Sequence, residues 1–352
     1  MKLLIGAAPS KLFHLKELAD AISKFGVECK IVNDIEYSDG FPSRKIKNWF
    51  KSKKKFKELI KEFKPDAILI DRQRHFGLDT IQTKIPLLVH LRGDFWEEVK
   101  WARDTIYKYP PKRMVLKQWE KMGEQCFSNA QIIFPICNYL EKRVKIQFPK
   151  KITKVMYQGI DPKKWYQTDG MKLNHPCVGL LQSATIWGKT KEMLFLKKVI
   201  QSMPDVTFYW VGDGPYREKI TSVLGNEENF KWLGSLNYPE QVRDYLSEID
   251  VYALISGIDM SPLSLQEAQL MKKPVIATNV GGIPELMIDK ETGFLVEKGN
   301  SQDIIEKISM LVNDKKLREK MGNTGQQFVK ENFSWEKIAK KFVDDIKQVL
   351  NK

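Results

Sequence analysis

Three residues in the second half of the chain have the types and spacing to bind a charged, hydroxyl-rich ligand. Asp259 and Glu267 lie eight residues apart in DMSPLSLQEAQLM, and Lys189 lies upstream in SATIWGKT. Carboxylates accept hydrogen bonds from pairs of hydroxyls, and such charge-assisted bonds contribute about 1.5–3 kcal/mol each. An ammonium group can neutralise a phosphate. Each residue alone also has a plain structural explanation, as a turn aspartate, a glutamate on a solvated helix face or a surface lysine.

The sequence around the two acids predicts a loop followed by a helix. Ser261 and Pro262 suit the N-cap and first turn of a helix that runs to about Met271, where KKP ends it. Asp259 then lies in the loop ahead of the helix, and Glu267 lies on the helix body. The unpaired amides of a first helical turn favour an anion such as a phosphate.

A glycine pair follows the strand PVIAT. Gly281 and Gly282 form a turn, and the sequence IPE at 283–285 predicts the start of the next helix. Paired glycines permit close approach of a ligand to the backbone, but they also occur in ordinary strand-to-helix turns. The pair is therefore a weak signal by itself.

The elements that must position these residues alternate along the whole chain. Helical patterns with three- and four-residue spacing, as at 12–22 and 304–311, separate short apolar runs. The runs are KLLIGA, VECKIV, DAILID, PLLVHL, QIIFPI and KVMYQG, then CVGLLQ, TFYWVG, FKWLG, DVYALI, PVIAT and GFLVE. This rhythm predicts an α/β fold of doubly wound, Rossmann-like parallel sheets, in which ligands bind outside the carboxyl ends of the strands.

The length of 352 residues favours two domains. WYQTDGMKLNHP, at 165–176, has low periodicity and separates two halves of different charge, so we place the boundary there. The expected domains are 1–168 and 172–334, facing each other across a cleft.

The net charge of +14 belongs to the first domain. Residues 1–170 hold 34 basic and 20 acidic residues, whereas residues 171–352 hold 24 of each. Within the first domain, residues 43–64 contain ten basic and two acidic residues with interleaved apolar ones. This segment is either a solvated helix face beside a packing stripe or a basic amphipathic surface for anionic lipid headgroups or a phosphorylated acceptor.

No metal centre is expected from the cysteines and histidines. The four cysteines are isolated, without a C-x-x-C pair or a cysteine–histidine cluster, and are expected to be reduced and mostly buried. The four histidines lack metal-ligand spacing, and His90 in PLLVHLRGD is expected to be a packed strand residue.

Several classes of protein are disfavoured by missing motifs. VGDGP at 211–215 does not complete G-x-G-x-x-G, which argues against a dinucleotide oxidoreductase, and neither a Walker nor a G-x-S-x-G sequence occurs. Nucleic-acid binding has only the basic charge in its favour and no recognisable motif. The first apolar run is too short for a signal peptide, and 18 consecutive apolar residues never occur. We therefore expect a cytoplasmic protein, with peripheral attachment to the cytoplasmic membrane face through residues 43–64 as an extension.

Taken in order, the segments resemble the retaining nucleotide-sugar glycosyltransferases of family 4, which share the two-domain GT-B fold. The resemblance covers nearly the whole chain. The matching segments are YQGID at 157–161, VGDGPYREKI at 211–220, FKWLGSL at 230–236, SEIDVYALIS at 247–256, PVIATNVGGIPELM at 274–287, ETGFLV at 291–296 and FSWEKIAKKF at 333–342. It implies an acceptor-side first domain, a donor-binding second domain and a final helix, 335–352, that crosses back to the first domain.

The resemblance also implies the roles of individual residues. The implied catalytic residues are Asp259, Lys189 and Arg92, and the implied donor-binding residues are Glu267, Gly6, Ala7, Ser183, Met260, Ser261, Leu263, Ser264, Trp232 and Leu236. Glu267 would hold the ribose and Asp259 the sugar hydroxyls. The ammonium of Lys189 and the amides of Leu263 and Ser264 would hold the diphosphate. Backbone near Trp232 and Leu236 would meet the base, while Gly6 and Ala7, after the first strand, would close over the diphosphate.

The chain departs from the family pattern at four positions. Asp259 stands where a glutamate is usual, and Ser183 stands where an arginine is usual. Arg92 replaces a frequent histidine, and Pro262 replaces a glycine. These departures bear on the catalytic geometry, and Arg92 is a candidate for the cation that Ser183 does not supply.

The expected activity is a metal-independent, retaining hexosyl transfer from a UDP- or GDP-sugar, without a cofactor, to a glycan or lipid-linked, anionic acceptor. Two alternatives of the same fold stay open. One is a sugar-nucleotide epimerase, and the other is a nucleotide-sugar-binding protein with weak or no turnover, which Asp259 and Ser183 motivate.

Overall fold

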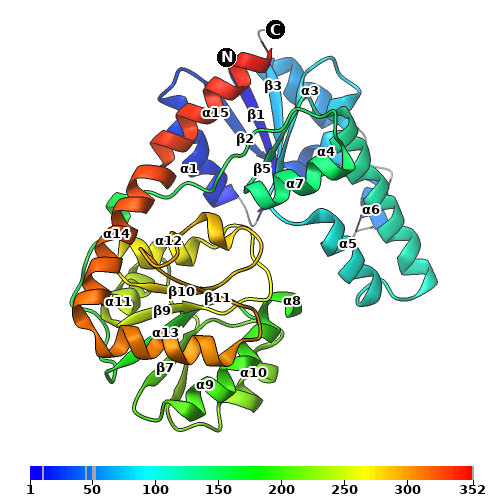
Figure 1. The fold of residues 1–352 in the computed structure, drawn as a ribbon. Helices are drawn as coiled ribbons and strands as arrows, with labels where there is room; N and C mark the ends of the chain where they lie inside the picture. The colour runs from blue at the N-terminus through cyan, green and yellow to red at the C-terminus, as the bar shows by residue number, and fades with distance from the viewer. Residues whose placement is uncertain (10–11, 44–45, 50–52, 351–352) are drawn as a thin grey trace. The chain divides into compact units, whose positions relative to one another are not determined.

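The computed structural model describes residues 1–9, 12–43, 46–49 and 53–350, which form two compact units (Figure 1). Unit 1 holds Met1–Gly159 together with the C-terminal helix α15 (Trp335–Leu350), and unit 2 holds Ile160–Ser334. Each unit contains one parallel β-sheet with its own core. The α/β class predicted from the alternating apolar runs is therefore confirmed.

The change of unit at Gly159 lies ahead of the boundary segment 165–176 that the sequence suggested. Two residues of that segment are bound to unit 2. Gln167 Nε2 donates to the carbonyl oxygen of Ser247 at 3.0 Å, and Thr168 Oγ1 donates to Ser247 Oγ at 3.0 Å. The low periodicity of the sequence at 165–176 correctly predicted irregular backbone. The hydrogen bonds with Ser247 show that this backbone is part of unit 2 and not a linker between the units.

The sheet of unit 1 has the strand order β2-β1-β3-β4-β5, with every neighbouring pair parallel. Its strands are β1 (Lys2–Ala7), β2 (Glu28–Asn33), β3 (Ala67–Ile70), β4 (Leu87–Leu91) and β5 (Ile132–Pro135). All residues of β3, β4 and β5 are buried. Continuous apolar runs are typical of parallel strands covered on both faces by helices.

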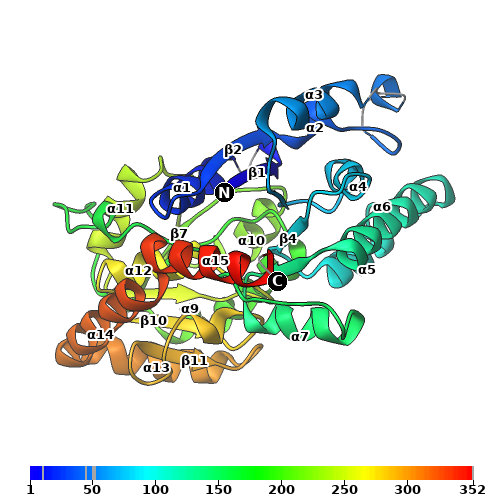
Figure 2. The same cartoon turned by 90° about the horizontal axis from the view of Figure 1, so that it is seen from above.

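Helices surround this sheet and bring the end of the chain back to its beginning. Besides α15, they are α1 (Leu12–Ser23), α2 (Asp34–Tyr37), α3 (Lys54–Phe63), α4 (His75–Ile81), α5 (Phe95–Asp104), α6 (Pro110–Asn129) and α7 (Asn138–Gln147), with the 3₁₀ turn η2 (Ile46–Asn48). In α15, Ile338, Phe342 and Ile346 join the core that contains Leu15 and Leu18 of α1. Figure 2 shows α5 and α6 side by side, which matters for the pocket described below.

The sheet of unit 2 has the strand order β11-β10-β9-β6-β7-β8, again parallel throughout. Its strands are β6 (Cys177–Leu181), β7 (Thr207–Val211), β8 (Phe230–Gly234), β9 (Val251–Leu254), β10 (Val275–Thr278) and β11 (Gly293–Val296). Its helices are α8 (Trp187–Thr190), α9 (Leu196–Ser202), α10 (Arg217–Leu224), α11 (Glu240–Glu248), α12 (Leu263–Leu270), α13 (Ser301–Asn313) and α14 (Lys315–Phe333), with 3₁₀ turns η3 (Pro162–Lys164), η4 (Lys191–Phe195) and η5 (Ile283–Glu285). The strand order reverses direction between β9 and β6, where a doubly wound sheet binds its ligand.

Two predicted elements differ from the structure. KVMYQG, residues 154–159, is not a strand: Lys154 and Met156 donate backbone hydrogen bonds to Ile133 and Pro135 of β5, but the segment leaves the sheet after that contact. The predicted helix after Gly282 is only the short turn η5. In both places the sequence pattern indicated the type of structure at the start of the segment but not how few residues continue its regular hydrogen bonding.

The basic segment 43–64 is only partly described, because residues 44–45 and 50–52 lie outside the described residues. Its described helix, α3, buries Phe56, Leu59 and Phe63 in unit 1 and leaves its lysines at the surface. The helix is thus amphipathic, as predicted, but it packs its apolar face into its own unit. Among the residues that the structure describes, none of the helices combines the length and apolarity that a bilayer crossing requires.

Candidate functional site

The structure brings Lys189 and Asp259 together. Lys189 lies on α8, after β6, and Asp259 lies in the loop between β9 and α12. Lys189 Nζ is 2.9 Å from Asp259 Oδ2, and the two side chains are 31% and 17% exposed. The loops also touch through the backbone, since Gly257 N donates to the carbonyl oxygen of Lys189 at 3.0 Å. Strands β6 and β9 are neighbours in the sheet, so the residues that follow them meet at its carboxyl edge.

The glycine pair after β10 supports the loop that carries Asp259. Gly282 N donates to the carbonyl oxygen of Asp259 at 2.8 Å. Gly281 has a φ of +58°, and a Cβ atom there would lie 2.1 Å from the same oxygen. Only glycine combines this left-handed conformation with such close packing. The pair therefore fixes the backbone of Asp259.

Glu267 is buried on α12, in contrast to the solvated helix face considered from the sequence. The residue is 4% exposed, and its Oε1 accepts a hydrogen bond from the hydroxyl of Tyr238 at 3.1 Å. Burial raises the pKa of Glu267 to about 7, although the hydrogen bond from Tyr238 acts in the opposite direction. A buried carboxyl group with a pKa this far above the ordinary value is typical of binding and catalytic sites.

Two tyrosines contribute to this region and were not identified from the sequence. Tyr238, in the loop after β8, donates to Glu267, and Tyr252 in β9 donates to Ser264 Oγ at 2.7 Å. The pKa of Tyr252 is raised mainly by burial, and the charges of Glu267 and Asp259 raise it further. Tyr252 thus lies within electrostatic range of both acids. The alternation of β9 placed Tyr252 in the sheet but gave no sign of which residue its hydroxyl would meet.

The start of α12 differs by one residue from the prediction. Pro262 occupies the N-cap position and has no side-chain cap, so Ser261 is not the capping residue. Ser261 Oγ is buried and has no hydrogen-bond partner among the described residues. Leu263 and Ser264, whose amides were predicted to bind phosphate, form the first turn, where amides have no intrahelical acceptor. A buried hydroxyl and a free helix N-terminus therefore lie next to Asp259 in the sequence.

Of the remaining predicted donor residues of unit 2, Met260 contacts Asp259 directly, and the other hydrogen bonds described here do not reach Lys189, Asp259 or Glu267. Met260 is buried, and its amide donates to Asp259 Oδ1 at 2.8 Å. Ser183 is exposed, and its hydroxyl lies 3.2 Å from that of Thr185. Trp232 in the middle of β8 is 39% exposed and donates from Nε1 to the carbonyl oxygen of Gly212 at 2.8 Å. Leu236 is half-buried in the loop that leads to Tyr238.

In unit 1 the predicted residues Gly6 and Ala7 lie inside β1 and not after it. Both are buried, and they pair with Val32 and Asn33 of β2. A Cβ at position 6 would lie 2.6 Å from the ring of Phe76, so the glycine makes room for a core side chain. The residue that follows the strand and reaches a pocket is Ala8.

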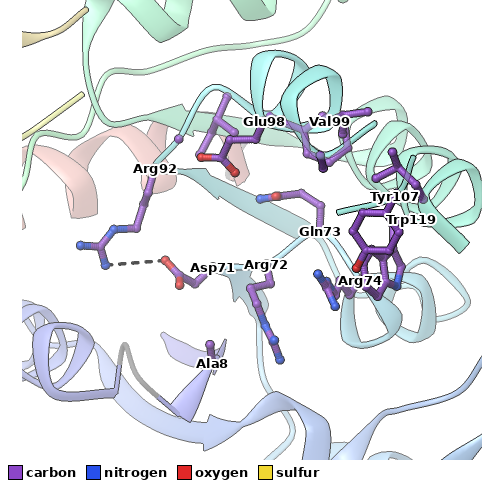
Figure 3. Close-up of a pocket in the computed structure, with 15 residues that line it drawn as sticks. Ala8, Asp71, Arg72, Gln73, Arg74, Arg92, Glu98, Val99, Tyr107 and Trp119 are labelled. Carbon is purple, nitrogen blue, oxygen red and sulfur yellow. Dashed lines mark ion pairs between the residues drawn. The ribbon is translucent and has the colours of Figure 1, made fainter. Parts of the chain in front are cut away.

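Arg92 lines that pocket, which has a volume of about 640 Å³ (Figure 3). The pocket lies at the carboxyl ends of β1, β3 and β4, and α5 and α6 supply its other wall. Arg92 Nη1 is 3.7 Å from Asp71 Oδ1, and Nη2 donates to Gln158 Oε1 at 2.9 Å. Burial lowers the pKa of Arg92, and Asp71 partly restores it. His90, the predicted packed histidine, is buried behind them, and its Nδ1 is 3.7 Å from the same oxygen of Asp71.

A second cluster of titratable residues lies away from these centres, where His175 and Cys177 precede and begin β6. His175 Nδ1 and Nε2 are each 2.8 Å from a carboxylate oxygen, of Asp250 and of Glu248 respectively. Ligand atoms of His175, Cys177 and Asp250 lie within 4.8 Å of one another. Spacing along the chain did not reveal this grouping, because Asp250 lies more than 70 residues away and directly precedes β9, the strand that pairs with β6.

Three of the four cysteines are buried, and all four are free thiols, as predicted.

Comparison with known proteins matches much of unit 2 to a family model. Residues 189–328, which contain Lys189, Asp259 and Glu267, match the model of glycosyl transferases group 1. An uncharacterized glycosyltransferase of Methanocaldococcus jannaschii is 29% identical over 216 residues, which are 60% of this chain and 58% of that protein. A trehalose synthase of Thermococcus litoralis is 27% identical over 263 residues, which are 71% of this chain and 60% of that protein. The chain thus spans less than two thirds of the length of these relatives.

Solved structures share the fold of the whole chain. Sucrose-phosphate synthase from Thermosynechococcus elongatus superimposes with a TM-score of 0.77 at 16% identity, covering 100% of this chain and 99% of that one. The Anabaena protein HepE in complex with UDP gives a TM-score of 0.70 at 18% identity, covering 99% and 100%. These similarities establish the GT-B fold, and the family match over residues 189–328 shows that this part of the chain resembles the group 1 glycosyltransferases.

Proposed function

We propose that the protein transfers a glycosyl group from a UDP- or GDP-sugar to an acceptor hydroxyl, with retention of anomeric configuration and without a metal ion. The observation that carries the proposal is the ion pair of Lys189 with Asp259, at the carboxyl edge of the unit 2 sheet and inside the matched family region. The two residues are 70 positions apart in the sequence and meet beside the N-terminus of α12. A cation and helix amides suit a diphosphate, and a carboxylate suits the hydroxyls of its sugar.

Glu267 is the proposed ribose ligand. Its carboxylate can accept hydrogen bonds from both ribose hydroxyls, and Tyr238 holds it in place. Because the side chain is buried, a ribose that binds it replaces little water, and each bond then contributes more than it would at the surface. The loop that holds Tyr238 also holds Leu236, in agreement with a base placed beside this loop.

The diphosphate is the proposed leaving group. The bond between the anomeric carbon and the diphosphate oxygen breaks, the bond to the acceptor oxygen forms, and the acceptor proton leaves with the nucleoside diphosphate. Lys189 and the amides of Leu263 and Ser264 stabilise the negative charge that develops on the leaving oxygen. Ser261 Oγ, buried without a protein partner among the described residues, adds a donor. Asp259 orients the sugar hydroxyls while it holds the ammonium group of Lys189.

The acceptor is proposed to be a glycan or a lipid-linked molecule that carries negative charge. Two relatives are named for anionic molecules, one as an N-acetyl-α-D-glucosaminyl L-malate synthase and one as a poly(ribitol-phosphate) α-N-acetylglucosaminyltransferase. Contact with an anionic membrane surface is part of the proposal. Lys53, Lys54 and Lys57 border a shallow groove on α3, and the nearby Ile46 and Trp49 are exposed apolar residues of the same basic segment.

The alternatives are an epimerase and a binding protein without turnover. The family match to glycosyl transferases favours transfer over epimerisation. The Lys189–Asp259 pair favours turnover over mere binding, because it supplies the cation that the leaving group needs although Ser183 stands in place of an arginine.

Nucleotide binding and turnover, measured on the full-length protein, test the proposal. UDP and GDP are compared by calorimetry, followed by their sugars, and the configuration of the product is read by NMR. Wild-type protein should bind the preferred nucleoside diphosphate about tenfold or more tightly than its 2′,3′-dideoxy analogue, and Glu267→Ala should remove that difference. Glu306→Ala, an exposed position on α13, is the matched control.

Lys189→Met should lower kcat on the order of 100-fold, because it removes the cation at the leaving group. Nucleotide binding should survive in this variant, since Glu267 is intact. Failure of both UDP and GDP to bind wild-type protein would overturn the proposal. Release of the donor sugar as a different epimer would support the epimerase instead, and binding without turnover on charged acceptors would support the binding protein.

A further inference from the structure

We propose that the pocket of unit 1 binds the acceptor through one anionic group, a carboxylate or a phosphate, held by Arg72 and Arg74. The proposal rests on the glycosyl transfer proposed above and specifies its acceptor. Both arginines come from the sequence DRQR at 71–74, which directly follows β3.

The position and the size of the pocket suit a small polar ligand. It opens at the carboxyl ends of β1, β3 and β4, the edge at which parallel sheets of this kind bind ligands. Its volume of about 640 Å³ is in the range of small-molecule sites. The lining combines charged residues from the strand ends with apolar ones from α5 and α6, such as Val99 and Leu116.

The charges of the lining are not balanced. Three arginines, Arg72, Arg74 and Arg92, face two acids, Asp71 and Glu98 (Figure 3). Arg92 is paired with Asp71, whose side chain is only 5% exposed. Cations therefore outnumber acids by one among the lining residues, and the acid that balances the third arginine, Asp34, lies outside the lining.

Arg72 is positioned by an acid outside the lining. Its Nε donates to Asp34 Oδ2 at 2.9 Å, and its Nη2 donates to Asp34 Oδ1. The arginine side chain is 27% exposed, whereas that of Asp34 is 4% exposed, so the cation is the accessible member of the pair. A guanidinium group has five N–H donors, and the two bonds to Asp34 use only one edge of it. The ion pair thus fixes the plane of Arg72 and leaves donors for a ligand.

Arg74 is positioned by an aromatic ring. Its guanidinium carbon lies 4.2 Å from the ring centroid of Trp119 on α6. Trp119 is itself fixed, because its Nε1 donates to the carbonyl oxygen of Pro42 at 3.2 Å and the ring of Tyr107 meets it edge-on at 5.3 Å. A stacked guanidinium keeps its N–H groups in its own plane, where they can bind an oxyanion with two parallel bonds. Figure 3 shows Arg74, Tyr107 and Trp119 together on one side of the pocket.

Binding of sugar probes to the full-length protein tests this assignment. Glucuronate and glucose 6-phosphate are compared with glucose by calorimetry, for wild-type protein, Arg74→Gln and the matched control Arg113→Gln. Arg113 is exposed on the same helix as Trp119, does not line the pocket and carries the same charge as Arg74. Circular dichroism and thermal unfolding check that each variant is folded.

We expect at least one charged probe to bind wild-type protein about tenfold more tightly than glucose, or about 1.4 kcal/mol. Arg74→Gln should remove most of this preference, and Arg113→Gln should retain it. Preference for glucuronate identifies a carboxylate acceptor, and preference for glucose 6-phosphate identifies a phosphorylated one.

Four results would overturn the assignment: equal affinity for glucose and the charged probes, no binding of either charged probe, a preference that survives Arg74→Gln, or an equal loss in both variants, which would indicate a general field effect. Inorganic phosphate bound as tightly as glucose 6-phosphate would show an adventitious ion only and would also overturn it. UDP and GDP binding in the same samples separates the two proposals. Retained nucleotide binding without a charged-probe preference refutes only the acceptor assignment.

Discussion

The buried carboxyl group of Glu267 couples the proposed donor site to the stability of the protein. Its pKa is about 7 in the folded protein, against an ordinary value of 4.5, because the side chain is buried and its hydrogen bond from Tyr238 only partly compensates. Below pH 4.5 the group is protonated in the folded and the unfolded states and has no effect on the pH dependence. Between pH 4.5 and about 7 only the unfolded state ionises, so the free energy of unfolding falls as the pH rises.

The size of this loss follows from the shift. Each unit of difference in pKa corresponds to about 1.4 kcal/mol, so the carboxyl group of Glu267 costs about 3 kcal/mol of stability above neutral pH. Glu267→Gln removes the ionisation and keeps an acceptor for the hydroxyl of Tyr238. The variant should therefore gain about 3 kcal/mol relative to the wild type between about pH 4 and about pH 8. It should also bind the nucleotide more weakly, since a neutral amide is a poorer acceptor for ribose hydroxyls.

Urea unfolding of both proteins across this pH range measures the effect. The free energy of unfolding of the wild type is subtracted from that of Glu267→Gln at each pH, so the contributions of the other titrating groups cancel. Glu306→Gln, at the exposed position on α13, provides the control and should give a difference that does not change with pH. A difference between Glu267→Gln and wild type that is the same at low and high pH would refute the reasoning. It would mean that the carboxyl group of Glu267 ionises in the folded protein as it does in water.

Two further substitutions test the packing around the sites. Gly281→Ala should destabilise the protein by about 1–2 kcal/mol or more and reduce turnover, because the left-handed backbone disfavours alanine and the new Cβ displaces the carbonyl of Asp259. Gly26→Ala is the control, because Gly26 has a φ of +77° but a Cβ atom there would meet nothing within 4 Å, so only the backbone strain is present. If both variants lowered the thermal midpoint equally and left turnover unchanged, this account would be contradicted. Hydrogen bonds to Asp250 and Glu248 raise the pKa of His175, so its stabilisation is complete below pH 6.5 and is lost as the pH rises through the raised folded-state value. Thermal unfolding of wild type and His175→Asn should show a wild-type advantage that disappears at alkaline pH, and a constant advantage would disprove the ion-pair role.

The alternation of apolar runs and helical patterns was sufficient to predict the α/β fold and eleven of its strands, because strand and helix periodicity depend on neighbours a few residues away. The same local signals placed Asp259 in a loop and Glu267 on a helix. They were less accurate where backbone leaves regular structure, as at Gly6 within β1 and at Ser261 before α12.

The chemistry of the sites depends on the tertiary structure. Lys189 meets Asp259 only because β6 and β9 are neighbours in the sheet, and Glu267 acquires a raised pKa only because the packing of α12 buries its carboxyl group. Likewise Arg74 reaches the ring of Trp119 only because α6 packs beside α4. Residue types and their local spacing therefore determined which groups were available, whereas contacts between segments far apart in the sequence determined their charge, their partners and the ligands that they can bind.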